Sequence, residues 1–385
     1  LLKSEDKARK RFVFSGGRLQ QLPEDPFSFV ASELISIRGK LRLATEVLLP
    51  QGDPSKDETV AEFVRRRLGQ EALDKLIDPM ASGVYAGDPN VMSMKSCFPK
   101  VVAIEQQFGG LLKGMMAMQK MAKARGQQGP QSAGPGGALW SFREGAAELP
   151  LRLAEELGED FRAGVSAVGL EKDGSGWTVA SSDGEKTKAD AVIVAAPAYD
   201  AGALLSALAP ESARLMGNIP YVATASVSVG FDRKAVSHPL DGFGFLIPYV
   251  EGRKILGALW SSSIFANRAP EGRVLLHIIL GGARRPELVR QDDAALEALA
   301  LEELKHTLGI AARPVFCRIV RWERAIPQYV SGHGARVAAI EAELAALGGI
   351  HLGGNAYYGI GYNDCTARAE ALGPKVLDGL AGAKG

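Results

Sequence analysis

The sequence predicts an α/β domain that is interrupted by an α+β domain and accompanied by a mainly helical region. Residues 191–197 form an uninterrupted apolar run, which is typical of a strand buried on both faces of a parallel sheet. Residues 221–282 instead contain successive strand patterns separated by turn residues. After residue 349 the chain returns to a strand, a glycine-rich turn and a helix, so the α+β part is inserted before the end of the α/β part.

The first part of the chain predicts a short strand followed by helices. The strand covers residues 11–14 and runs into a Ser-Gly-Gly turn, whereas residues 26–125 are mainly helical. Within this helical region, residues 59–62 form a capping box, and Gly69 is a suitable residue to end the helix that the box begins.

Three breaks are expected in or after this helical region. A helix that begins near Glu71 should end before Asp78-Pro79. Residues 82–89 contain two glycines and an Asp-Pro pair, which predict a tight, closely packed loop. The Gln-, Gly- and Pro-rich stretch 126–137 predicts a second loop, where the chain leaves the helical region.

The helical pattern that reaches residue 125 combines several methionines with lysines. This composition has two interpretations. A helix that lies in a membrane interface carries an apolar face beside basic residues, and methionine adapts to irregular apolar ligands. An ordinary helix with a core-facing stripe and lysines in water explains the pattern equally well.

From residue 138 the chain alternates between strand and helix patterns. Trp177 begins a strand that should pair, across an Asp183-Gly184 turn, with a strand near Ala189. The remaining predicted strands are 165–170, 222–231, 242–249, 255–260, 274–280 and 315–322, and the predicted helices are 293–308 and 337–347.

The glycine-rich turn near the C-terminus is the most informative segment for chemistry. Residues 350–352 resemble a strand, residues 353–361 contain four glycines, and a helix follows. The unpaired N–H groups of a helix's first turn and the helix dipole stabilise negative charge. Asn363 or Asp364 would cap this helix, and Pro374 would kink it or end its first half. An ordinary strand–loop–helix connection shows the same pattern.

Composition excludes several other classes of function. The 385 residues suit two or three domains, and a formal net charge of +1 with 46% hydrophobic residues is typical of a globular protein without general affinity for nucleic acid. The three cysteines form no C-x-x-C pair and the five histidines form no i,i+4 pair, so we expect neither a disulfide framework nor a metal site. No apolar run approaches the 18 residues of a membrane-spanning helix, and no signal peptide is visible.

A dinucleotide-binding glycine motif is missing. None of the Gly-x-Gly pairs continues to G-x-G-x-x-G, the pattern that lets a backbone approach a pyrophosphate closely. The chain also begins with Leu1 rather than methionine, in what resembles the middle of a domain. We therefore expect a fragment: either the protein does not bind a dinucleotide, or the βαβ unit with this motif lies upstream.

Several short runs together resemble one known family. In chain order they are Arg11-Phe12-Val13 with Gly16-Gly17 and Leu22-Pro23, Phe63 with Arg66-Arg67-Leu68-Gly69, Gly83-Val84-Tyr85-Ala86-Gly87-Asp88, Ser96-Cys97-Phe98-Pro99, Gly242-Phe243-Gly244, Ile326-Pro327-Gln328-Tyr329 and the C-terminal glycine-rich turn. From about Arg11 to its end the chain is similar to the protoporphyrinogen oxidase family, oxygen-dependent flavoenzymes of the amine oxidase superfamily. Members carry their G-x-G-x-x-G near the N-terminus, which this chain lacks.

The resemblance implies a discontinuous, Rossmann-type FAD-binding domain, a mixed-sheet substrate domain and a helical membrane-binding region. By this comparison, residues 1–25 begin the substrate side and residues 26–135 form the membrane-binding region. Residues 136–210 and 349–385 would belong to the FAD domain, and residues 211–348 to the substrate domain.

The resemblance also implies functional residues. Arg11 matches the arginine that binds a substrate propionate, although on sequence alone it could belong to a solvated basic run. The other positions that match the lining of the macrocycle site are Gly83, Phe243, Leu246 and Ile279. The positions that match contacts to FAD are Val168 beside the adenine, Trp322, and Ile360, Gly361 and Tyr362 at the flavin ring. Apart from Arg11 and the turn residues, these side chains could equally be plain core residues.

The expected activity is FAD-dependent oxidation of protoporphyrinogen IX to protoporphyrin IX in haem biosynthesis, with O₂ as acceptor and H₂O₂ as product. Because the cofactor carries this chemistry, no catalytic side chain is assigned. Two alternatives stay open: oxidation of coproporphyrinogen III to coproporphyrin III, and a non-catalytic fragment that binds porphyrin or membrane. The expected partners are the porphyrinogen, O₂ and a membrane surface, with a homodimer as the usual prior, and the expected location is cytoplasmic and peripherally membrane-associated.

Overall fold

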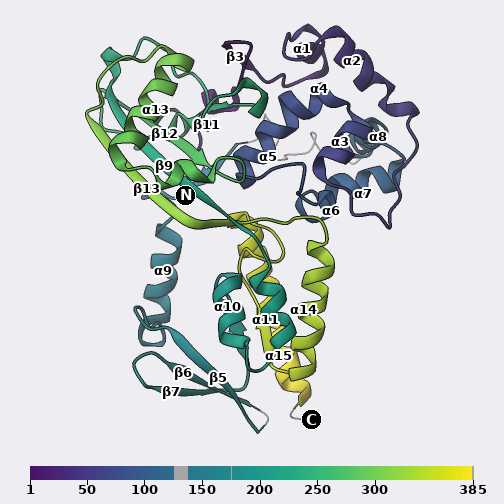
Figure 1. Ribbon diagram of the computed structural model, residues 1–385, viewed down its shortest axis with the longest axis vertical. Coiled ribbons are helices and arrows are strands. Elements are labelled where there is room, and N and C mark those ends of the chain that lie inside the picture. The colour runs from purple at the N-terminus through teal and green to yellow at the C-terminus, as the bar shows by residue number, and fades with distance from the viewer. Residues whose placement is uncertain (125–137, 175, 384–385) are drawn as a thin grey trace. The chain divides into compact units, whose positions relative to one another are not determined.

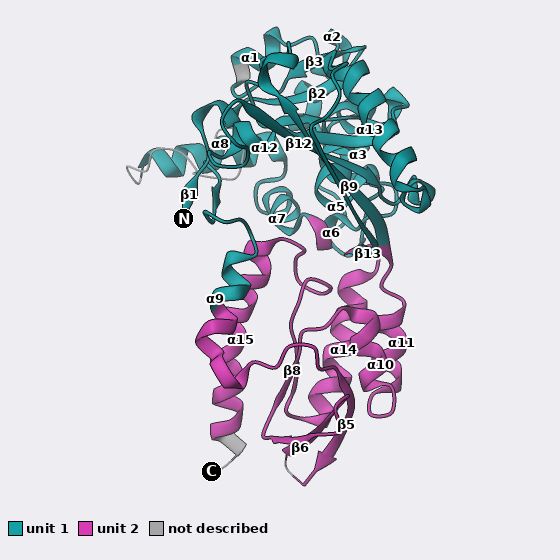
Figure 2. Cartoon of the chain, turned by 90° about the vertical axis from the view of Figure 1, so that its left-hand side faces the viewer, with its two compact units in different colours: residues 1–94, 98–152, 222–325 teal, residues 95–97, 153–221, 326–385 magenta. Residues whose placement is uncertain are grey.

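The computed structural model describes residues 1–124, 138–174 and 176–383 (Figure 1). The chain forms two compact units, which Figure 2 distinguishes by colour. Unit 1 comprises Leu1–Met94, Phe98–Arg152 and Val222–Ala325, and unit 2 comprises Lys95–Cys97, Leu153–Tyr221 and Ile326–Gly385. The loop predicted over 126–137 lies outside the described residues.

Unit 1 is built on a mixed, seven-stranded sheet with the strand order β13-β9-β12-β11-β10-β2-β3. β2 and β10 pair in parallel, whereas β2–β3, β10–β11, β11–β12 and β12–β9 are antiparallel. The strands are β2 Arg11–Ser15, β3 Arg18–Gln21, β9 Tyr221–Asp232, β10 Gly244–Leu246, β11 Ile255–Leu259, β12 Arg273–Gly281 and β13 Phe316–Pro327. The predicted strands are all present here, but β10 is shorter than the expected 242–249 and β13 extends beyond its expected end. The sequence did not predict β3.

One face of this sheet carries the main hydrophobic core of unit 1. Alternate residues such as Phe245 on β10 and Ile278 on β12 are buried against helix α13, Asp293–Leu308, which crosses the sheet in Figure 1. Leu296 and Leu304 of α13 are fully buried in the same cluster. Each such side chain contributes about 1.5–3 kcal/mol on burial, so the core fixes which residues face the opposite side.

The predicted helical region is confirmed over residues 26–124. Its helices are α1 Pro26–Ala31, α2 Ile37–Ala44, α3 Val60–Arg67, α4 Gln70–Ala72, α5 Asp78–Tyr85, α6 Met94–Cys97, α7 Pro99–Phe108 and α8 Leu111–Ala124, with a 3₁₀ turn, η2, at Thr45–Leu48. The capping box is present, because the Thr59 side chain accepts the Glu62 N–H and the Glu62 carboxylate accepts the Thr59 N–H. No helix within the described residues has the length and apolar composition needed to cross a bilayer.

Two predicted breaks in this region are wrong. The helix near Glu71 does not end before Asp78-Pro79 but continues through a π-helical turn at Leu73–Ile77 into α5. Pro79 directly follows this π-helical turn, where the hydrogen-bond register of the helix changes, so the proline does not end the helical segment. The loop expected over 82–89 therefore starts only at Ala86, which ends α5 with a left-handed backbone (φ 49°).

Unit 2 contains a small parallel sheet with helices, and an antiparallel meander. β8 Val192–Val194 pairs with β14 Ile350–Leu352, while β5 Ala167–Asp173, β6 Gly176–Ser181 and β7 Lys186–Ala189 form the meander. The pairing predicted for Trp177 and Ala189 is confirmed. Helices α10 Ala198–Leu205, α11 Pro210–Gly217 and α14 His333–Leu347 lie side by side (Figure 1) and pack in the core that includes Val194 and Leu352.

The expectation of a strand buried on both faces over 191–197 is wrong. β8 covers only three residues, and Ile193, which points away from the helices, is 48% exposed. The described residues thus cover one face of this sheet, and β8 pairs only with β14. The last helix, α15 Tyr362–Ala383, continues past Pro374, so the expectation that Pro374 ends it is also wrong.

The remaining elements are short strands, helices and turns along the chain. They are β1 Leu2–Lys3 paired with β4 Trp140–Ser141, α9 Glu148–Leu157, α12 Ser261–Ile264, and the 3₁₀ turns Asp6–Arg9, Gly158–Asp160, Arg233–Ala235, Tyr249–Glu251 and Pro286–Arg290.

A buried network of charges holds the helical region together. Arg67 is fully buried and pairs with Glu46 at 3.3 Å and with Glu105 at 2.5 Å. Glu105 also accepts Arg66 at 2.8 Å and the Gly52 N–H at 2.9 Å. Burial opposes ionisation of Glu105, but the bonds from Arg66, Gly52 and Arg67 outweigh it and lower the pKa of this carboxyl. Removing one partner would leave a buried charge uncompensated.

Glu105→Gln should therefore reduce the free energy of unfolding by about 3–5 kcal/mol at pH 7. Because the folded protein lowers the pKa of Glu105, its contribution is present above the usual value of 4.5 and is lost as the pH falls through the folded value. Denaturant midpoints should be measured for the wild type and the variant at pH 7 and below pH 4.5. The stability that acid removes should be smaller in the variant than in the wild type. The exposed Glu211, paired with Arg214, provides the control as Glu211→Gln; an equal effect there would contradict the assignment.

Candidate functional site

The predicted substrate-side residues lie on the second face of the seven-stranded sheet, opposite the core with α13. In the strand register, Arg11 is opposite Gly244, Leu246 is opposite Gly257, and Gly257 is opposite Ile279. Because side chains alternate along a strand, Arg11, Leu246 and Ile279 project from the face that Phe245 and Ile278 do not occupy. They are partly buried and do not belong to the core cluster, so the plain-core interpretation is wrong for Leu246 and Ile279.

Arg11 is held at this face, and the described part of the chain offers it no carboxylate partner. Its guanidinium carbon lies 5.2 Å from the ring centroid of Phe243, and its Nε is buried without a hydrogen bond. Its guanidinium makes no ion pair with any residue that the structure describes. Burial lowers the pKa of Arg11, which reflects the cost of keeping this charge out of water. The interpretation of Arg11 as a fully solvated surface residue is therefore wrong.

Phe243 and Gly83 complete this group. The Phe243 N–H donates to the Lys10 carbonyl at 2.8 Å and its carbonyl accepts the Trp260 N–H at 2.9 Å, which fixes the backbone beside Arg11. Gly83 lies on α5, directly over Leu246: a Cβ at this position would be 2.6 Å from Leu246 Cδ2. Any larger residue here would displace the Leu246 side chain, so glycine lets α5 lie close to it.

Arg284 anchors both ends of the segment that contains Gly83, and sequence reasoning missed it. Its guanidinium pairs with Asp78 at 2.5 Å and with Asp88 at 2.9 Å, and lies 4.5 Å from the Tyr249 ring centroid. Burial lowers the pKa of Arg284, but Asp88 and Asp78 outweigh this effect and the net shift is upward. This partly buried pairing cannot be recognised from the sequence, because Arg284 is distant along the chain from Asp78 and Asp88.

The predicted cofactor-side turn lies in unit 2, at the ends of β8 and β14. Gly354 has φ +89°, and a Cβ there would lie 3.0 Å from the Ala195 carbonyl oxygen. The turn continues through Gly359, whose φ is +140°. Glycine is thus required both for the backbone conformation and for the close approach of two strand ends.

The N-terminus of α15 follows this turn and brings Ile360, Gly361 and Tyr362 together. The first helical hydrogen bond runs from the Cys365 N–H to the Gly361 carbonyl at 3.0 Å. Asp364 acts from the third helical position, where its carboxylate accepts the Gly361 N–H at 3.1 Å. The Ile360 N–H has no hydrogen-bond partner in the described part of the chain. This backbone donor is available to a ligand.

Tyr329 holds both ends of the same turn, a role that sequence reasoning missed. Its hydroxyl donates to the Asn355 carbonyl at 2.6 Å and accepts the Gly359 N–H at 2.8 Å. Tyr329 belongs to the Ile-Pro-Gln-Tyr run, but nothing in that run indicates a contact with residues 355–359. The contact exists because the chain folds back after α14.

Val168 and Trp322 remain predictions as cofactor contacts. Val168 is 62% exposed on β5, and Trp322 is 48% exposed on β13. Both interpretations as core residues are wrong. Val168 lies in unit 2 with the turn, whereas Trp322 lies in unit 1.

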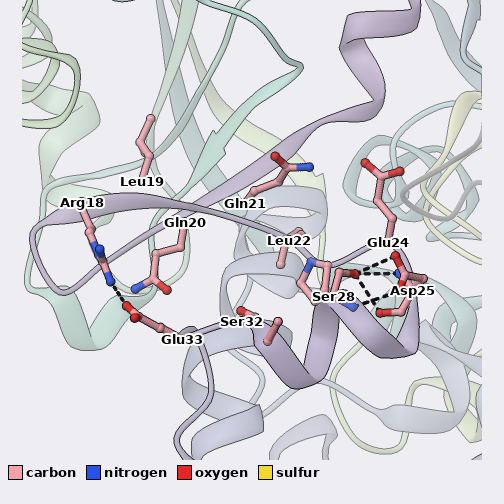
Figure 3. A pocket seen from close by; sticks show the side chains of 12 residues that line it. Arg18, Leu19, Gln20, Gln21, Leu22, Glu24, Asp25, Ser28, Ser32 and Glu33 are labelled. Atoms are coloured by element: carbon pink, nitrogen blue, oxygen red, sulfur yellow. Dashed lines mark hydrogen bonds and ion pairs between the residues drawn. The ribbon is translucent and has the colours of Figure 1, made fainter.

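A hollow of about 620 Å³ between β3 and α1 contains none of the predicted site residues. Figure 3 shows that its polar side chains bond to one another: Arg18 pairs with Glu33, and Asp25 accepts hydrogen bonds from Ser28. Its polar groups are therefore largely satisfied without a ligand. In the parts of the chain that the structure describes, no group of His, Cys, Asp and Glu residues could hold a metal ion.

Comparison with known proteins identifies a family that the chain resembles along most of its length. Residues 2–370 match the model of the family described as flavin containing amine oxidoreductase. Protoporphyrinogen oxidase 1 from Arabidopsis thaliana is 32% identical over 382 residues, which cover 94% of this chain and 71% of that protein. Coproporphyrinogen III oxidase from Bacillus subtilis is 30% identical over 357 residues, covering 92% of this chain and 75% of that protein.

A solved structure from Exiguobacterium sp. 255-15, named for a proposed protoporphyrinogen oxidase activity, superimposes with a TM-score of 0.80 at 27% identity. The match covers 98% of this chain and 82% of the other. The mixed sheet, the strand–turn–helix at the end of the chain and these relatives agree on one conclusion. The chain belongs to the flavin-containing amine oxidoreductase family.

Proposed function

We propose that this protein acts in the FAD-dependent oxidation of protoporphyrinogen IX to protoporphyrin IX, with O₂ as acceptor and H₂O₂ as product, in haem biosynthesis. The single observation that carries the proposal is Arg11, a partly buried cation at the edge of an apolar sheet face, which has no anionic partner among the described residues. A porphyrinogen is a broad apolar ring with propionate side chains. Arg11 would bind one propionate, while Leu246 and Ile279 contact the macrocycle.

The contribution of this face is binding and orientation. Guanidinium presents two parallel donors to a carboxylate, so Arg11 fixes both the position and the direction of the ring. Leu246 and Ile279 exclude water from the macrocycle, and Gly83 lets α5 cover it closely. The energy of these contacts holds the substrate where its hydrogens can be removed.

The residues of the glycine-rich turn fit a flavin. The unpaired Ile360 N–H and the N-terminus of the 22-residue helix α15 would stabilise negative charge on the pyrimidine end of the ring. When bound, FAD accepts the hydride equivalents that leave the substrate. The chain contains no G-x-G-x-x-G for the pyrophosphate, so the support for FAD rests on the turn and on the family.

Coproporphyrinogen III is the alternative substrate, which the similarity to the Bacillus subtilis protein favours. It carries more propionates than protoporphyrinogen IX, and its pocket must therefore neutralise more charge. Rates measured on both porphyrinogens, with oxygen consumption recorded, decide between them. Faster oxidation of coproporphyrinogen III would replace the first proposal with the second.

A non-catalytic role in binding porphyrin or membrane is the alternative of another class. The described part of the parallel sheet has only two strands, fewer than such sheets usually contain. Purification with added FAD, followed by desalting and absorbance of bound flavin, distinguishes the two. A colourless chain that still binds porphyrin would support the non-catalytic role.

We also propose peripheral attachment to a membrane through one apolar surface of the helical region, with a cytoplasmic location. In this region α2 contacts η2, and η2 contacts α8. These three elements carry the exposed apolar side chains Ile37, Leu41, Leu48, Met115 and Met116. Lys113, Lys120 and Lys123 of α8 would meet anionic headgroups. A homodimer stays a prediction.

Arg11→Met should raise the KM for the porphyrinogen roughly 10- to 100-fold, because a hydrogen-bonded ion pair with the propionate is lost. Arg11→Lys should give a smaller rise, since it keeps the charge but not the paired donors. Steady-state oxidation assays with flavin content recorded provide the measurement. Arg9→Met, in the same basic run, is the control because Arg9 pairs with Asp6 instead. An unchanged KM in Arg11→Met would refute the propionate contact.

Gly83→Ala should raise the same KM by roughly fivefold or more, because the new methyl group displaces Leu246 onto the sheet face. Adding Leu246→Ala should relieve the overlap and lower the KM of the double variant below that of Gly83→Ala. Gly217→Ala serves as the matched control, since a Cβ at Gly217 meets nothing within 4 Å. If adding Leu246→Ala raises the KM above that of Gly83→Ala, the overlap between the new methyl group and Leu246 is not the cause of the weaker binding.

Met115→Glu with Met116→Glu should lower binding to vesicles of anionic phospholipid roughly tenfold or more, because two apolar side chains leave the interface and two repulsive charges enter. Co-sedimentation measures the bound fraction. Leu377→Glu on α15, at a residue that is 67% exposed, controls for a general effect of added charge. Equal losses in both variants would argue against a membrane surface on α8.

A further inference from the structure

One tyrosine hydroxyl bridges the turn that the proposed function places against the flavin. Tyr329 lies between β13 and α14 and is 1% exposed. Its hydroxyl donates a hydrogen bond to the Asn355 carbonyl at 2.6 Å and accepts one from the Gly359 N–H at 2.8 Å. A single group thus fixes the separation between the two ends of the segment 355–359.

The ring of Tyr329 is itself held in place. It stacks on His333, the first residue of α14, with ring centroids 4.0 Å apart and an interplanar angle of 12°. His333 Nε2 lies 3.3 Å from the carbonyl oxygen of Tyr357, inside the same turn. The Tyr329 carbonyl accepts the Cys97 thiol at 3.6 Å. Burial raises the pKa of Tyr329, so the hydroxyl keeps its proton and remains both donor and acceptor at physiological pH.

The turn needs such a constraint because of its composition. Gly354 and Gly359 adopt positive φ angles, which glycine permits. Glycine also permits many other backbone conformations, so these residues alone do not fix the shape of the turn. The Ile360 N–H follows directly after Gly359, so any change in the Gly359 peptide changes the direction of the Ile360 donor. Other side chains hold single groups of this backbone: Asp364 accepts the Gly361 N–H, and His333 lies against the Tyr357 carbonyl. Tyr329 is bonded to both ends of the segment 355–359.

We propose that Tyr329 is a positioning residue that holds the glycine-rich turn in the conformation from which Ile360 and the first turn of α15 donate toward the flavin. This inference rests on the proposed function, because it assigns the turn to the cofactor. Tyr329 contacts the backbone of the turn rather than the cofactor. Its loss should therefore alter flavin binding and the flavin midpoint potential through the turn.

The test compares Tyr329→Phe with Tyr221→Phe in the full 385-residue chain. Tyr221 is a matched control: it is partly buried in unit 2, and its hydroxyl accepts the Ala198 N–H at 3.0 Å, at the start of α10 rather than in the turn. Both variants lose one hydroxyl that satisfies a backbone N–H. A general loss of stability would therefore affect both.

The first measurement is amide hydrogen exchange of residues 353–362 in flavin-free protein. In Tyr329→Phe the Gly359 N–H loses its partner, and its exchange should accelerate roughly tenfold or more, whereas Tyr221→Phe should leave these residues unchanged. Unchanged exchange in Tyr329→Phe would overturn the proposal. This measurement does not depend on whether the chain binds FAD.

The second measurement is the midpoint potential of bound FAD, with its absorbance spectrum. Tyr329→Phe should shift the potential to more negative values, because misdirected N–H donors stabilise reduced flavin less. Faster exchange without any change in potential or flavin affinity would overturn the positioning role, although the hydrogen bonds exist. Failure of the wild-type chain itself to retain FAD would instead count against the proposed function.

Discussion

The parallel pairing of β2 with β10 is the constraint on which the candidate substrate site depends. The two strands are far apart in the sequence, yet Arg11 lies opposite Gly244 and Val13 lies opposite Leu246. A shift of one residue in this register would move Arg11 to the face where Phe14 and Phe245 form the core. The apolar core on one side of the sheet therefore fixes the position of a cation on the other side.

The pairing of its charge distinguishes Arg11 from Arg67, Arg284 and Arg253, which are also largely removed from water in unit 1. Arg67 is paired with two carboxylates, and so is Arg284, because an unpaired buried charge costs several kcal/mol. Arg253 is paired with Glu303 in the same way. Arg11 has an aromatic ring beside it but no carboxylate among the residues that the structure describes. Its desolvation would be compensated by a bound anion, which is the physical reason behind the proposal that it binds a ligand carboxylate.

In unit 2, contacts from other residues hold a glycine-rich turn in one backbone conformation. The glycines are needed because β8 and β14 end close together, as the short approach of Gly354 to Ala195 shows. The same glycines would leave the turn loosely defined if it were held only by its own residues. Tyr329 and Asp364 supply the missing restraints from outside the turn and from the helix that follows. The conformation of the turn that we propose to hold the cofactor is thus fixed by separate segments of the chain.

The sequence by itself determined the local elements, because their signals are local. The capping box of Thr59 and Glu62, the hairpin of Trp177 and Ala189, the strand positions of the large sheet and the helix after the glycine-rich turn all follow from neighbouring residues. The family resemblance supplied the site residues. Local patterns failed at Pro79, which resembles a helix stop but follows a π-helical turn inside a continuous helical segment.

Only the tertiary structure decided which of these residues act together. Arg11, Leu246 and Ile279 share a face because of strand register, and Gly83 joins them because Arg284 anchors its segment. The exposure of Ile193, Val168 and Trp322 could not be predicted, because an apolar residue in a strand has the same local pattern whether its face is covered or open. The two hydrogen bonds of the Tyr329 hydroxyl to the glycine-rich turn could not be predicted either. Burial, pairing of charges and hydrogen bonds across the fold depend on segments that are distant in the chain, and no local pattern records them.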